Sequence, residues 1–182
     1  MLFRSAFRRR GDILKRWPDS GLTRHDLVNN AKDLCAAYQS AGRWVELRDT
    51  AAEARTSARL LVKENPNKLV TQMNCLIVLQ YAAEAFGHFG QPTALTEALD
   101  EQARPLELLI AQERDASARH NIAETLYQRS VLLSRHGQPD RAKADRTRGL
   151  GVVQKALDEL PKESPQRANF ESLKAQLTAA PE

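Results

Sequence analysis

The chain has 182 residues, of which 27% are charged and 5% are aromatic, and its formal net charge is +4 at pH 7. No apolar run approaches the roughly 18 residues of a membrane-spanning helix, and runs of valine, isoleucine and threonine typical of strands are absent. The composition therefore predicts an all-α protein, and we expect no membrane partner.

The positive charge is concentrated at the N-terminus. Residues 1–17 contain six basic residues and one acidic residue, whereas residues 18–182 contain 21 basic and 22 acidic residues. A nucleic-acid-binding face gathers positive charge along the folded surface. Only the first 17 residues do so, and we expect no nucleic-acid partner.

The first expected element is an amphipathic helix over residues 2–17, which Pro18 ends. Prolines recur at repeat spacing after later helices, so we interpret residues 1–17 as the orphan second helix of a truncated repeat. Its uncovered apolar side predicts a homodimer interface or the tail of a longer array. The alternative is a basic amphipathic helix that lies on a membrane or serves as a targeting segment.

Gly42, Gly90 and Gly137 each separate two segments with helical spacing, at intervals of 48 and 47 residues. Self-similarity at such a period is typical of a helical solenoid. Pro105 predicts a break near Gln102 in one of the helices. The expected helices cover residues 23–40, 43–64, 68–89, 92–113, 117–136, 139–160 and 164–179, the last as a capping helix. The three repeats are expected at residues 20–66, 67–115 and 116–161.

A small residue stands seven positions before each turn glycine, and a large residue follows it three positions later in every repeat. A small residue lets the two helices of a hairpin approach closely, and the large one fills the space beside it. The small residues are Cys35, Ala83 and Ser130, and the large ones are Tyr38, Phe86 and Leu133.

This pattern resembles the tetratricopeptide repeat family. The resemblance departs from the family in its period, which is about 34 residues there, and in Leu47 and Leu95, which stand where the family has a small residue. The longer period resembles the elongated arrays attached to bacterial signalling proteins, including serine/threonine kinases.

The resemblance implies a right-handed superhelical solenoid of antiparallel helix hairpins, a single array over residues 1–182 with about eight helices. In the family, the first helices line a concave face along which peptides or proteins bind. Carried onto this register, the partner-binding groove comprises Asn29, Lys32, Asp33, Gln39, Gln80, Tyr81, Glu84, His88, Glu124, Tyr127, Gln128 and Arg135. Tyr81 and Tyr127 are the expected contact anchors.

No catalytic, metal-binding or cofactor-binding pattern is expected. The four histidines are scattered without partners at ligand spacing, and no glycine-rich loop follows a strand. Cys35 and Cys75 lie in helical runs, where we expect reduced, buried thiols in a cytoplasmic protein.

Two functions follow from these expectations. The first is a non-enzymatic protein-interaction module, one part of a larger signalling or regulatory protein. The alternative is a structural scaffold that self-associates through its N-terminal helix.

Overall fold

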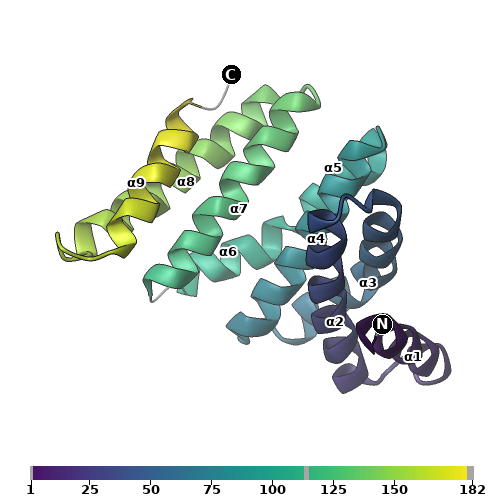
Figure 1. Cartoon of the computed structure of the whole chain (residues 1–182). Helices are drawn as coiled ribbons and strands as arrows, with labels where there is room; N and C mark the ends of the chain where they lie inside the picture. Colours follow the sequence, from purple (N-terminus) through teal and green to yellow (C-terminus); the bar gives the residue numbers. More distant parts are fainter. Residues whose placement is uncertain (1, 113–114, 180–182) are drawn as a thin grey trace. The chain divides into compact units, whose positions relative to one another are not determined.

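The computed structural model describes residues 2–112 and 115–179, and over these ranges the chain forms nine α-helices and no strand (Figure 1). The all-helical prediction is confirmed. The helices are α1 (Leu2–Arg16), α2 (Gly21–Ser40), α3 (Trp44–Glu64), α4 (Leu69–His88), α5 (Pro92–Glu101), α6 (Ala103–Gln112), α7 (Ala116–Arg135), α8 (Pro139–Glu159) and α9 (Gln166–Ala179).

The helices form two compact units, residues 1–108 and 109–182. In the first unit, α1 packs on α2, α2 on α3, α3 on α4 and α4 on α5, and α2 also lies beside α4. In the second unit, α7 and α8 form a hairpin, and α9 packs on both of them. In each unit, therefore, the first helix of a hairpin also contacts the helix that follows the hairpin.

The three turn glycines adopt the left-handed conformation that the hairpins require. Gly42, Gly90 and Gly137 have φ values of 67°, 62° and 72°. After each glycine, the next residue donates its backbone N–H to a carbonyl in the last turn of the preceding helix. These bonds join Arg43 to Tyr38 at 2.8 Å, Gln91 to Phe86 at 2.9 Å, and Gln138 to Leu133 at 2.9 Å. Glycine has no Cβ to clash at positive φ, which explains its recurrence at these turns.

The small residues before these turns lie in the helix interfaces. Cys35, Ala83 and Ser130 are fully buried, and the large residues that follow them (Tyr38, Phe86 and Leu133) are buried as well. Burial raises the pKa of Cys35 to about 12, and that of Cys75 to about 12. Both thiols are free and stay protonated at neutral pH.

A polar side chain in the first turn of α4 and α9 closes the end of the preceding hairpin. Gln72 is fully buried and donates its Nε2 to the carbonyl oxygens of Val62 at 3.2 Å and Asn65 at 2.8 Å. Arg167 donates its Nη1 to the carbonyl oxygens of Leu157 at 2.6 Å and Leu160 at 3.0 Å. Arg167, Leu157 and Leu160 stand 95 residues after Gln72, Val62 and Asn65, respectively. Helix α9 therefore occupies the register of a further first helix.

The other two first helices carry arginine at the same register position. Arg24 forms an ion pair with Glu64 and donates to the Pro18 carbonyl at 2.8 Å. Arg119 forms the equivalent pair with Glu159 at 2.6 Å. Both arginines are buried, and each ties the start of a first helix to the end of its own hairpin.

The break expected near Gln102 is confirmed. Helix α5 ends at Glu101, and α6 begins at Ala103 with the Leu106 N–H donating to the Gln102 carbonyl at 3.1 Å. Proline has no N–H to continue the α5 ladder, so Pro105 explains the break and the ninth helix.

Helix α2 begins earlier than expected because Ser20 caps it. The Ser20 Oγ accepts a hydrogen bond from the Thr23 N–H at 3.4 Å, and it also lies 2.7 Å from the Thr23 hydroxyl. Capping by a serine that precedes the first turn starts the helix at Gly21 rather than at Thr23.

Two glycines in α8 offer a test of the packing of α9. A Cβ on Gly149 would lie 3.0 Å from the Leu177 Cδ2 and 3.5 Å from the Leu126 Cβ, whereas a Cβ on Gly151 would meet nothing within 4 Å. The missing side chain at Gly149 therefore lets Leu177 of α9 pack closely against α8, whereas Gly151 faces open space.

We predict opposite outcomes for the two alanine variants. Gly151→Ala should stabilise the protein by about 0.5–1 kcal/mol through helix propensity. Gly149→Ala should lose that gain to overpacking, which costs about 1–3 kcal/mol. Urea unfolding with unchanged m-values measures the difference, and equal stabilisation by both variants would contradict the α8–α9 packing.

Candidate functional site

Polar side chains from α2 and α4 meet along the line where these two helices lie side by side. The Asn74 Nδ2 donates to the Asn29 Oδ1 at 2.7 Å, and the Lys32 Nζ donates to the Asn74 Oδ1 at 3.5 Å. Farther along the helices, Glu84 accepts hydrogen bonds from the Gln39 Nε2 and, at 2.9 Å, from the Gln80 Nε2. We call this row the α2–α4 face; it comprises Asn29, Lys32, Asp33, Gln39, Asn74, Gln80, Tyr81 and Glu84.

Seven of these eight residues were expected at a partner-binding groove, and Asn74 was missed. It lies seven residues before Tyr81, two helical turns away on the same side of α4. That spacing was a usable signal for Asn74. Gln80 differs from the others because it is buried, with 6% of its surface exposed.

The electrostatics of the face centre on Glu84. Burial raises the pKa of the Glu84 carboxyl, and the hydrogen bonds from Gln80 and Gln39 offset part of that effect. The pKa of Tyr81 is also raised, first by burial and then by the charge of Glu84, with smaller contributions from Cys35 and Asp33. The Tyr81 hydroxyl therefore interacts electrostatically with acidic groups of both helices, Asp33 of α2 and Glu84 of α4.

His88, the last expected groove residue of α4, lies against another element. Its ring stacks on Trp44 at the start of α3, with a centroid distance of 4.2 Å and an interplanar angle of 9°. It also meets Phe89 edge-on at 5.2 Å. These contacts place His88 beside the glycine turns of the α2–α3 and α4–α5 hairpins.

The groove residues expected from the third repeat all lie on α7, in the second unit. The Gln128 Nε2 donates to the Glu124 Oε1 at 3.4 Å, and the His120 Nδ1 lies 3.7 Å from the Glu124 Oε2. Tyr127 is partly buried and Arg135 is exposed. Within this unit, the structure brings Glu124 and Gln128 together.

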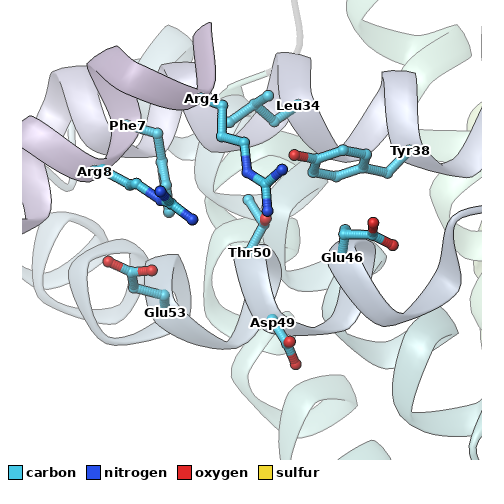
Figure 2. Close-up of a pocket in the computed structure, with 9 residues that line it drawn as sticks. All are labelled: Arg4, Phe7, Arg8, Leu34, Tyr38, Glu46, Asp49, Thr50 and Glu53. Atoms are coloured by element: carbon cyan, nitrogen blue, oxygen red, sulfur yellow. The ribbon is translucent and has the colours of Figure 1, made fainter. Parts of the chain in front are cut away.

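A cavity of about 190 Å³ lies where α1 covers the α2–α3 hairpin (Figure 2). In Figure 2 the guanidinium group of Arg4 extends toward Tyr38 and Thr50, and Arg8 lies on the same side as Glu53. The complete lining is Arg4, Phe7, Arg8, Leu34, Tyr38, Glu46, Asp49, Thr50 and Glu53. Phe7 is buried, so it anchors α1 through the apolar part of this lining.

The sequence pattern does not reveal this cavity, because the cavity depends on how α1 is rotated over the hairpin. The arginines are four residues apart on α1, and the carboxylates recur at helical spacing on α3, so each group forms a stripe. Opposite charges on the two stripes favour the docking of α1. We interpret the cavity as part of that joint.

A second cavity of about 480 Å³ lies between α3 and the α5–α6 break. Its acidic wall is occupied: Glu101 forms ion pairs with Arg55 at 2.6 Å and with Arg59 at 3.0 Å. The break at Gln102 lies beside this second cavity. The helical pattern of the sequence did not predict the cavity.

Among the described residues, no group of three or more histidine, cysteine, aspartate or glutamate side chains is placed to hold a metal ion. None of the helices in the described ranges is long and apolar enough to cross a bilayer. Comparisons with protein-family models, curated proteins and solved structures gave no significant match. The role of the α2–α4 face must therefore be argued from its own geometry.

We predict that Glu84 makes stability depend on pH. Because the pKa of Glu84 is raised in the folded state, the native state favours the protonated carboxyl. The contribution of this carboxyl to the free energy of unfolding is therefore fully present below the unfolded-state pKa. It is lost as the pH rises through the folded-state pKa. Relative to Glu84→Gln, the natural chain should lose stability as pH rises above the ordinary glutamate range. Chemical unfolding of both proteins at a series of pH values measures this difference, and a pH-independent difference would contradict the burial of Glu84.

Proposed function

We propose that this protein is a protein-interaction module that binds an extended peptide segment of its partner along the α2–α4 face. The observation that carries the proposal is the row of side-chain amides held between two parallel-running first helices. Asn29 and Asn74 are bonded to each other, and Gln39 and Gln80 both hold Glu84.

Such a row suits the recognition of a peptide backbone. An amide side chain carries both donors and acceptors, so it can bond the N–H and C=O groups of an extended segment. Mutual hydrogen bonds fix the amides before binding, which reduces the entropy lost on association. Tyr81, partly buried in the row, offers a rigid aromatic anchor.

The resemblance to tetratricopeptide repeats supports the same function, since those arrays bind peptides along their first helices. On that basis we also propose that the helices belong to a right-handed superhelical array, that the chain works within a larger signalling or regulatory protein, and that it acts in the cytoplasm. The recurrent glycine turns and the buried small residues before them are compatible with such a repeat.

Selection from a displayed library of random 12-residue peptides tests this function. We predict enriched peptides whose affinity, measured by isothermal titration calorimetry, falls about tenfold in Tyr81→Ala, as for an interface anchor. Trp17→Ala, which removes an exposed aromatic residue elsewhere in the same unit, is the matched control and should bind normally. Failure to enrich any peptide would contradict the proposal, as would equal binding by both variants and the natural chain.

Self-association is the second candidate function, and the exposed apolar residues at the end of α1 favour it. Ile13, Trp17 and Leu22 are 40%, 60% and 78% exposed, and they lie close in sequence around the α1–α2 turn. Exposed apolar patches mark interfaces when they are contiguous. A second copy of the chain is the occupant that this candidate assigns.

Sedimentation equilibrium over a range of concentrations tests this candidate. The natural chain should form a dimer whose dissociation constant rises at least tenfold in Trp17→Ser with Leu22→Ser, because the apolar contact is lost. Val45→Ser, at an exposed apolar residue of α3, is the control and should dimerise normally. A monomer at every concentration would rule out self-association.

A further inference from the structure

We infer that the α2–α4 face binds a basic side chain, the ammonium group of lysine or the guanidinium group of arginine, of the bound peptide, with Glu84 as the counter-charge. The inference rests on the proposed function and assigns the chemistry of the partner. It comes from the contacts around one carboxylate.

Glu84 differs from two other carboxylates of the first unit, each of which pairs with arginine. Glu101 pairs with Arg55 and Arg59, and Glu64 pairs with Arg24. Within the described residues, Glu84 has no lysine or arginine at ion-pair distance, and its hydrogen-bond partners are the neutral amides of Gln39 and Gln80. A partly buried carboxylate is thus held in place without a cation to balance it.

A second observation points to the same place. Gln80 is more than nine-tenths buried, its Nε2 is bonded to Glu84 at 2.9 Å, and its Oε1 has no hydrogen-bond partner among the described residues. A buried acceptor without a partner destabilises the unbound state, so a donor that reaches it is favoured. The amide that positions Glu84 therefore has an acceptor left for a donor that arrives beside it.

The surroundings favour a cation over a neutral donor. The charges of Glu84 and Asp33 both raise the pKa of Tyr81, which places two acidic groups near one phenol ring. Asp33 is partly balanced by Lys32, whose Nζ lies 3.7 Å from its Oδ1, so the uncompensated charge is that of Glu84. The Tyr81 ring adds a surface over which a cation is attracted.

The remaining hydrogen-bonding capacity of Glu84 also fits. A carboxylate has about four acceptor sites, and Gln39 and Gln80 use one on each oxygen. A lysine or arginine N–H can take a free site and restore the charge balance that burial disturbs. A hydroxyl or an amide would leave the negative charge unbalanced, and an acidic side chain would be repelled.

The same library selection tests this inference through the amino-acid composition of the enriched peptides. Peptides enriched by the natural chain should share a lysine or arginine at one position, and replacing that residue by glutamine should weaken binding by about tenfold or more. Glu84→Gln should weaken the basic peptide to the same extent and leave the glutamine peptide unaffected. Glu53→Gln is the matched control: burial also raises the pKa of the Glu53 carboxyl, but this residue lies under α1, and binding should be unchanged.

The outcomes separate this inference from the function on which it rests. If peptides are enriched but share no basic residue, or if Glu84→Gln binds the basic peptide as tightly as the natural chain does, the inference is overturned and the proposed function stands. If no peptide is enriched, the proposed function is overturned and the inference falls with it. Melting curves of each variant at the pH of the binding assay, none of which should fall below that of the natural chain, ensure that a loss of binding reflects a changed site.

Discussion

The rest of the structure depends on the hydrogen bonds that join the end of one hairpin to the start of the next helix. A helix leaves its last carbonyl groups without partners. Gln72 satisfies those of Val62 and Asn65, and Arg167 satisfies those of Leu157 and Leu160. Because each donor sits in the first turn of the incoming helix, the bond fixes both the position and the rotation of that helix.

This joint explains why α2 and α4 lie side by side. A tight glycine turn reverses the chain from α2 into α3, and the Gln72 joint reverses it again into α4. The first helices of successive hairpins then run in the same direction with their polar sides adjacent. The bond between Asn29 and Asn74 and the two amide bonds to Glu84 all follow from that placement.

Local features of the fold could be predicted from the sequence because their causes are local. A glycine between two helical runs predicts the hairpin turn at Gly42, and a proline without an N–H predicts the break before Pro105. The predicted start of α2 was wrong by two residues. Ser20 and Thr23 are both residue types that cap helices, and only the backbone conformation decides which of them does so.

Features that depend on two distant segments could not be predicted. Helical spacing put Glu84 and Gln80 on one side of α4, but their relation to Gln39 depends on the α3–α4 joint, which brings together residues 45 positions apart. The role of Gln72 was missed for the same reason, since its partners are backbone carbonyls, which no side-chain pattern reveals. The cavity under α1 depends likewise on the rotation of a separate helix.

The central claim is that a partner peptide lies along the α2–α4 face. Nuclear magnetic resonance tests it most directly, because the side-chain amide groups of asparagine and glutamine give their own signals. On titration with an enriched peptide, the account predicts shifts in the side-chain signals of Asn29, Gln39, Asn74 and Gln80, while those of Gln154 on α8 stay in place. Shifts at Gln154 with unchanged signals from the α2–α4 face would contradict it.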